Sequence, residues 1–164
     1  MSKPIDDHPE LPLDPDAADE RAASPLHLRA GAVGLVAMGG FVGTAARYGL
    51  TLLEPTRAGA WPFATFIANL GGAFVLGALL EGLARSGPDA GWRQRVRLLL
   101  GTGFCGALTT YSTLATDADL LIRSHDGGLA LAYLITSLVG GLLATVGGIG
   151  VATGHHHLKR GQAA

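Results

Sequence analysis

Residues 127–154 read GGLALAYLITSLVGGLLATVGGIGVATG, a run of 28 residues without a charged side chain. A helix needs about 20 predominantly apolar residues to cross a hydrocarbon core roughly 30 Å thick. Three more charge-free stretches precede this one, at Ala30–Ala46, Phe63–Leu80 and Leu98–Thr116, and short polar segments connect the four. The sequence therefore predicts an all-α membrane protein whose four transmembrane helices form one domain, residues 26–154.

The charges outside these stretches are unevenly distributed along the chain. The formal net charge of the 164 residues is only -1, but seven of the 13 acidic residues and five of the 8 prolines lie in residues 1–25. A segment of this composition buries too little apolar surface to offset the entropy of ordering. We predict that residues 1–25 are a disordered, acidic, proline-rich tail and that residues 155–164 are a short cytoplasmic C-terminal tail.

Lysine and arginine residues near the helix ends indicate the orientation. Four crossings place both termini on the same side of the membrane. When Arg47 and the distant Lys3 are set aside, eight basic residues lie on that side and two lie on the other. The eight are Arg21, Arg29, Arg85, Arg93, Arg95, Arg97, Lys159 and Arg160, and the two are Arg57 and Arg123. Because cytoplasmic loops carry the excess of basic residues, the termini are predicted to be cytoplasmic.

Glycine is unusually frequent, with 25 residues, about twice the globular share of roughly 7%. Lipid gives helices no hydrophobic incentive to associate, so membrane helices pack through small residues that allow close backbone approach. Pairs and triplets of small residues four positions apart occur in three of the stretches, and we expect them at helix contacts. They are Gly39 and Gly43, Ala73 and Gly77, and Gly140, Ala144 and Gly148.

Few polar residues interrupt the apolar stretches, and these are the candidates for function because burying them in lipid is costly. Arg47 directly follows the first stretch, where it either snorkels to a headgroup or, inside the protein, pairs with another group or fixes the backbone of a neighbouring segment. Asn69 lies near the middle of the second and either bonds another helix or donates its NH2 group to an anion. Tyr133 and Ser137 lie one turn apart in the fourth.

The third stretch differs most from a plain membrane helix. Residues 101–114 read GTGFCGALTTYSTL and contain three glycines and five hydroxyl side chains besides the tyrosine, four of them threonines, which are poor helix formers. Non-helical backbone at membrane depth is tolerated only where protein buries it or water lines it. We expect a break near Gly106–Thr110, where freed carbonyls would hold a cation and hydroxyls would donate to an anion. An unbroken helix with Thr and Ser bonded to its own carbonyls is the alternative.

Catalytic groups are scarce in the spans. All six histidines lie outside the four stretches, and no nucleophile has a histidine within its own span. The single cysteine, Cys105, excludes an internal disulfide framework and a cysteine-cluster metal site. We therefore predict that the protein is not an enzyme.

Three motifs resemble one known family, the small fluoride channels called Fluc or CrcB proteins. The motifs are Gly-x-x-Gly-x-x-x-Arg-Tyr at Gly40–Tyr48, Asn-x-x-Gly at Asn69–Gly72, and Gly-Phe-Cys-Gly-x-x-Thr-Thr-aromatic-Ser-Thr at Gly103–Thr113. The similarity extends over roughly Gly31–Gly150, which includes all four stretches. The third motif is long and specific.

The resemblance implies an antiparallel, dual-topology dimer with two fluoride pathways at its interface and a structural sodium ion at its centre. Gly106 and Thr109 match the positions whose carbonyls hold the sodium, and Asn69 matches the amide that bonds fluoride. Tyr111 matches the first of two pore phenylalanines. The remaining pathway candidates are Arg47 near the vestibule, the hydroxyls of Ser112 and Thr113, and the fourth-helix pair Tyr133 and Ser137. The implied role is passive export of cytoplasmic fluoride across the cell membrane, which relieves fluoride toxicity.

One position departs from the family pattern, because Leu114 stands where the second pore phenylalanine is usual. Leucine has no ring edge to present to an anion. The eight-to-two distribution of basic residues also contrasts with the balanced loops that a chain inserting in both orientations needs. We therefore hypothesise a single orientation and a heterodimer with a homologous, oppositely oriented subunit; the homodimer remains the alternative.

Two other functions compete with this interpretation. A non-conducting scaffold subunit of such a channel would also account for Leu114. A small, proton-coupled multidrug exporter has the same length and helix number, but it needs a carboxylate embedded in the membrane. Asp117 and Asp119, near the far end of the third stretch, are the candidates for that carboxylate.

Overall fold

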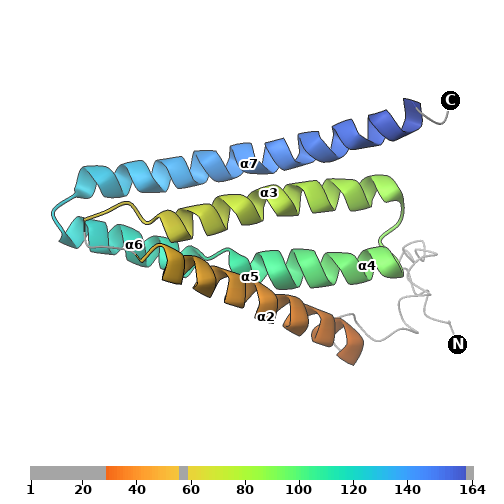
Figure 1. The fold of residues 1–164 in the computed structure, drawn as a ribbon, viewed down its shortest axis with the longest axis horizontal. Coiled ribbons are helices and arrows are strands. Elements are labelled where there is room, and N and C mark those ends of the chain that lie inside the picture. Colours follow the sequence, from red (N-terminus) through yellow and green to blue (C-terminus); the bar gives the residue numbers. More distant parts are fainter. Residues whose placement is uncertain (1–28, 56–58, 162–164) are drawn as a thin grey trace, which may run out of the picture.

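The computed structural model describes residues 29–55 and 59–161, with the backbone alone for residues 155–161. Within these ranges the chain is all helical, and four antiparallel spans lie side by side (Figure 1). The predicted tail at residues 1–25 and the end of the predicted tail at 155–164 lie outside the described residues. Three spans are single helices and the third is made of several pieces. The single helices are α2 (Ala30–Leu53), α3 (Phe63–Ser86) and α7 (Gly127–Gly161).

All four spans are long and apolar enough to cross a membrane, which confirms the predicted number of crossings. Three of them begin at the predicted residues, Ala30, Phe63 and Gly127. Each continues past its charge-free stretch, as α2 does beyond Arg47. Long side chains such as arginine reach the interface from inside a span, so the helix does not have to end at the charge. The protein is a multi-pass membrane protein.

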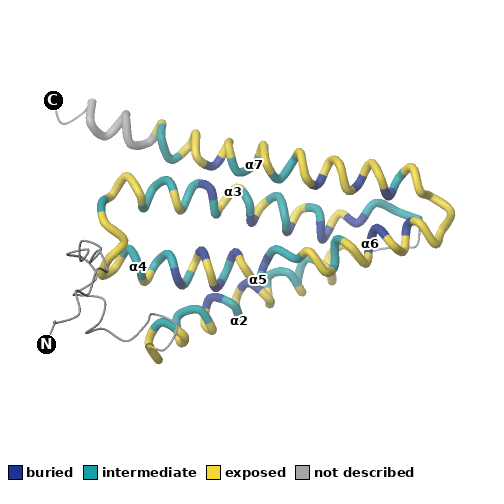
Figure 2. The backbone as a smooth tube through the Cα atoms, turned by 180° about the vertical axis from the view of Figure 1, so that it is seen from behind, coloured by how far each residue is buried: buried dark blue, intermediate teal, exposed yellow. Residues whose placement is uncertain are grey.

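Small residues bring the spans together where the sequence places them. The Cβ atom of any larger residue at Gly39 or Gly43 of α2 would collide with the carbonyl oxygens of Leu99 and Phe104. At Gly77 of α3 it would lie 2.5 Å from the carbonyl oxygen of Thr145 in α7. The predicted contacts through small residues are therefore confirmed for both helix pairs. Figure 2 shows the buried residues on the faces that the helices turn toward one another.

The third span consists of four joined pieces. These are α4 (Trp92–Val96), the π-helix η2 (Arg97–Cys105), α5 (Gly106–Leu108) and α6 (Tyr111–Arg123). The wide π-helical register continues through Gly106, whose N–H donates to the carbonyl of Gly101. Between α5 and α6, Thr109 (φ -77°, ψ 151°) and Thr110 (φ -151°, ψ 122°) have extended backbones. The span is thus bent and joined, and its two non-helical residues lie in the predicted segment.

Candidate functional site

A cavity of about 160 Å³ lies between α2, α3 and the start of α6. Hydroxyl groups and one guanidinium form its polar lining, and none of the lining residues is a carboxylate. The complete lining is Thr44, Arg47, Tyr48, Thr51, Ala64, Thr65, Thr110 and Thr113. Hydroxyl and guanidinium groups supply the hydrogen-bond donors that an anion needs, so the chemistry of the cavity is suited to a small anion.

Arg47 joins the cavity to the bend in the third span. Its Nε donates to the carbonyl oxygen of Ala107 over 3.0 Å, in a partly buried position. This carbonyl is in the last turn of α5, where helical oxygens have no partner within the helix. Of the roles predicted for Arg47, fixing the backbone of a neighbouring segment is confirmed.

Removing the Arg47 donor is expected to destabilise the bend. Arg47→Met keeps the length of the side chain but leaves the Ala107 carbonyl without its donor, which costs about 1–3 kcal/mol. The free energy of unfolding in detergent micelles measures the loss. Arg123→Met is the matched control, because Arg123 is 73% exposed and pairs only with Asp119 on the surface. Equal losses in the two variants would contradict a specific role for Arg47.

Asn69 of α3 pairs with the backbone of the second extended residue. Its Nδ2 donates to the carbonyl of Thr110 over 3.1 Å, and its Oδ1 accepts the Thr110 N–H over 2.7 Å. The side-chain amide thus satisfies both backbone groups of one residue that the bend removes from the helix. One N–H of the amide remains for another acceptor, because Nδ2 carries two.

Hydroxyl groups complete the polar lining at the start of α6. The Thr110 Oγ1 accepts the N–H of Thr113 over 3.1 Å and so caps the helix. The same oxygen donates to Thr113 Oγ1 over 3.0 Å and lies 3.1 Å from the Oγ of Ser112. Both predicted hydroxyl candidates, Ser112 and Thr113, therefore belong to one network that is centred on Thr110, and Thr113 lines the cavity.

Tyr111 does not line the cavity and is 83% exposed on this single chain. Its neighbour Thr109 bonds its own hydroxyl back to the Cys105 carbonyl over 2.9 Å. Among the described residues, none donates a hydrogen bond to the carbonyl oxygens of Gly106 and Thr109. Two free carbonyl oxygens are the groups that can coordinate a cation.

Tyr133 and Ser137 do not line the cavity and lie in the buried contact of α7. Tyr133 is completely buried, and its ring meets the edge of Trp61 at 5.5 Å. Its hydroxyl lies 3.5 Å from Oδ2 of Asp117, a carboxylate that is only 5% exposed. The hydroxyl of Ser137 is buried and has no partner among the described residues. These residues form a second polar group that adjoins the cavity, because the side chain of Thr65 in the cavity lining hydrogen-bonds to that of Tyr133.

Comparison with known proteins places the chain in one family. The model of the family "CrcB-like protein, Camphor Resistance (CrcB)" matches residues 34–149. The chain belongs to the CrcB family. A relative from Leifsonia xyli, named fluoride-specific ion channel FluC 2, is 45% identical over 129 residues, which are 79% of this chain and 88% of the relative. Another from Cutibacterium acnes, fluoride-specific ion channel FluC 1, is 46% identical over 111 residues, 68% of this chain and 78% of the relative.

Membership of the CrcB family bears on two of the sequence predictions. The predicted resemblance is confirmed, and the family is one of ion channels and not of enzymes. Membership of an ion-channel family also leaves no ground for interpreting the chain as a multidrug exporter. The two carboxylates considered for that function differ in surroundings, since Asp117 is buried beside Tyr133 and Asp119 is exposed and paired with Arg123.

Several cavity residues of this CrcB protein were not among the predicted site residues. Thr44, Tyr48 and Thr51 line the cavity together with Arg47. Arg47, Tyr48 and Thr51 lie three, four and seven residues after Thr44, so all four side chains share one helix face. That periodicity in the first span is the signal that identifies them, and it becomes recognisable once Arg47 is known to point inward.

Proposed function

We propose that this chain is a subunit of a fluoride channel that carries fluoride passively out of the cell. The observation that supports the proposal is the cavity of hydroxyl groups and one guanidinium, without a carboxylate, beside a bent span. Fluoride is small and strongly hydrated, so a pathway has to replace its water with donors at every step. The names of the relatives agree with this ion.

In the proposed pathway Arg47 attracts the anion to the cavity. The hydroxyls of Thr65 and Thr113 then donate hydrogen bonds that replace those from the water molecules that fluoride loses. The next donor along the pathway, beyond Thr110, is the N–H of the Asn69 amide that is not bonded to the Thr110 carbonyl. No lining residue is a titratable base, so flow follows the fluoride gradient and the membrane potential without proton coupling. Tyr133 and Ser137 are proposed as the later part of the pathway on α7.

The extended residues Thr109 and Thr110 are proposed as the functional break of the third span. The free carbonyl oxygens of Gly106 and Thr109 fit a structural sodium ion, because backbone carbonyls replace the hydration shell of such a cation. Two oxygens from one chain bind a cation weakly. A second subunit is therefore proposed to contribute its own carbonyls at the same place, which agrees with an antiparallel dimer and with the exposure of Tyr111 at this level.

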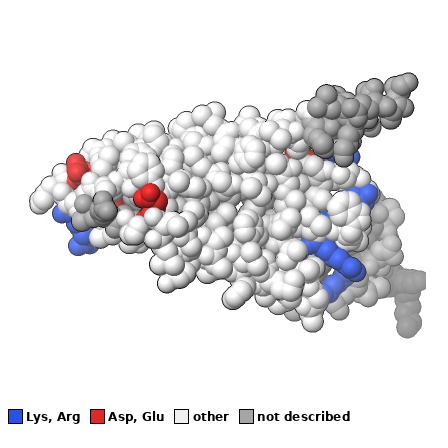
Figure 3. All heavy atoms as spheres, viewed as in Figure 1, with Lys and Arg blue, Asp and Glu red and all other residues white. Residues whose placement is uncertain are grey.

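The distribution of charge supports one fixed orientation, with cytoplasmic termini. In Figure 3 most basic atoms lie toward the end of the bundle that holds α4, and most acidic atoms lie toward the end where α6 meets α7. Among the residues whose side chains the structure describes, and with Arg47 of the cavity set aside, the first end has five arginines and two acids, and the second has one arginine and four acids. The first set is Arg29, Arg85, Arg93, Arg95, Arg97, Glu81 and Asp89, and the second is Arg123, Glu54, Asp117, Asp119 and Asp126. The basic end is proposed to face the cytoplasm.

A single orientation requires an oppositely oriented homologue to complete the antiparallel pair. Leu114 supports the same heterodimer, because its side chain packs against the buried cluster around Tyr133 and supplies no aromatic edge. Tyr111 is then the single aromatic residue that this chain offers at the two positions. In a heterodimer the partner's aromatic residues would complete one intact pathway.

Fluoride release from liposomes, measured with a fluoride-selective electrode, tests both parts of the proposal. We expect release above that of protein-free liposomes when this chain is reconstituted together with its homologue, and no such release from this chain alone. Chloride-loaded liposomes are the selectivity control. Release from this chain alone would overturn the heterodimer but keep the channel, and no release from either preparation would overturn the fluoride channel itself.

A further inference from the structure

An apolar groove of about 520 Å³ runs between α2 and η2, on the membrane-spanning part of the bundle. No charged or polar side chain lines it. Its floor is formed at Gly39, where the backbones of the two helices are closest. Its walls include Gly34, Met38 and Phe41 from α2 and Leu99 and Phe104 from η2. A groove of this shape and composition accepts a flexible hydrocarbon chain.

An arginine with an unpaired guanidinium precedes the groove by one turn of the third span. Arg95 lies one helical turn before Leu99, so the two side chains project from the same face of the third span. Arg95 is exposed, and its guanidinium makes no ion pair or hydrogen bond with the described residues. Trp92, one turn earlier, is 59% exposed, and exposed tryptophan marks the headgroup level of a membrane. Arg95 is therefore at the depth of lipid phosphates.

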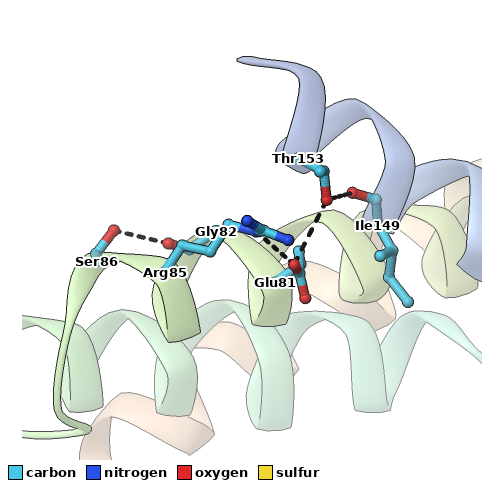
Figure 4. Close-up of polar contacts among 6 residues, drawn as sticks. All are labelled: Glu81, Gly82, Arg85, Ser86, Ile149 and Thr153. Carbon is cyan, nitrogen blue, oxygen red and sulfur yellow. Dashed lines mark hydrogen bonds and ion pairs between the residues drawn. The ribbon is translucent and has the colours of Figure 1, made fainter. Parts of the chain in front are cut away.

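The other arginines within residues 81–97 are already engaged. Arg85 pairs with Glu81, which also accepts the hydroxyl of Thr153 from α7 (Figure 4). Arg97 pairs with Asp89 over 2.7 Å.

Arg93 is held in a different way. It lies over the Trp92 ring at 5.5 Å and donates to the Pro88 carbonyl over 3.4 Å. Within residues 81–97, Arg95 is thus the guanidinium that remains open to an external anion, and the neighbouring charges give this end a positive excess that favours an anion.

We propose that the groove is a binding site for one anionic phospholipid, with an acyl chain between α2 and η2 and the phosphate on Arg95. An apolar face alone would fit lipid or a second protein equally. The guanidinium at the water end of the groove favours the lipid, because a phospholipid has an anionic head joined to an apolar chain. This site is separate from the proposed fluoride pathway, which lies further along α2 around Arg47 and Thr65.

Binding of phosphatidylglycerol and phosphatidylcholine to the detergent-purified full chain, measured by native mass spectrometry, tests the headgroup contact. We expect Arg95→Gln to weaken phosphatidylglycerol binding about fivefold, the effect of losing one basic residue at a membrane surface. The control is Arg123→Gln at the opposite end of the bundle, which is expected to leave binding unchanged. Equal effects of the two substitutions would overturn the assignment of the phosphate to Arg95.

A second pair of variants tests the acyl-chain contact. A Cβ atom at either Gly34 or Gly31 would meet no atom within 4 Å, so both sites accept a larger residue without a clash. Only Gly34 lines the groove. Gly34→Leu is expected to reduce the retention of both lipids, and Gly31→Leu is expected to leave it unchanged. If Gly34→Leu changed the ratio of monomer to dimer and left lipid binding unaffected, a second protein chain and not a lipid would occupy the groove.

Discussion

Replacing Asn69 with aspartate is expected to lower fluoride efflux from liposomes that carry the assembled channel by about 100-fold. A lost hydrogen bond and an added negative charge act together, and each costs about 1–3 kcal/mol. Aspartate can still accept the Thr110 N–H, but it cannot donate to the Thr110 carbonyl as Nδ2 of Asn69 does. It also brings a negative charge next to a cavity proposed to hold an anion. The initial rate of release, read with a fluoride-selective electrode, measures the loss.

Thr145→Val is the control for this experiment. The Thr145 hydroxyl bonds only the Gly141 carbonyl of its own helix, so its removal tests the general effect of losing a partly buried hydroxyl in a span. Efflux at the wild-type rate is expected. If Asn69→Asp also left efflux unchanged, the amide of this chain would not be on the pathway, and the scaffold-subunit alternative would replace the conducting one.

Replacing Gly39 with alanine is expected to have the largest effect on stability. The added Cβ atom would overlap the Leu99 carbonyl oxygen and lie 2.9 Å from the Phe104 N. Both obstacles are backbone atoms, which cannot rotate away, so α2 has to separate from η2. We expect the free energy of unfolding in detergent micelles to fall by about 3 kcal/mol, at the upper end of the cost of overpacking.

Gly40→Ala is the matched control, since it adds the same methyl group one position along the same helix. Its Cβ atom would meet the nearest atom, Ala107 Cβ, at 3.9 Å, which is ordinary contact. Alanine favours a helix over glycine, so stability is expected to stay equal or rise slightly. A similar loss in both variants would mean that the close approach of α2 and η2 does not determine the stability of the bundle.

The four spans could be predicted from the sequence because each is a long charge-free stretch, and such a stretch has one favourable placement in a membrane. The contacts at Gly39, Gly43 and Gly77 followed for a similar reason. Close packing in lipid depends on small residues four positions apart, and this pattern can be recognised without knowing the partner helix.

The details of the site depended on contacts between distant segments. Two alternative roles of Asn69 were left open by its position in the sequence, and only the fold shows that its amide pairs with the backbone of Thr110. The π-helical register of η2 also has no local signature, since residues 97–105 include ordinary helix formers such as Leu98 and Leu99. Both features result from the way α2 and α3 pack against the third span.

The pairing of Asn69 with Thr110 also affects how the chain enters the membrane. The two residues are 41 positions apart, so at 5–20 residues per second Thr110 is synthesised about 2–8 s after Asn69. During this interval the second span carries an amide whose final partner does not yet exist. The amide must therefore stay near water or the translocation machinery until the third span arrives, which links the insertion of the two spans in time.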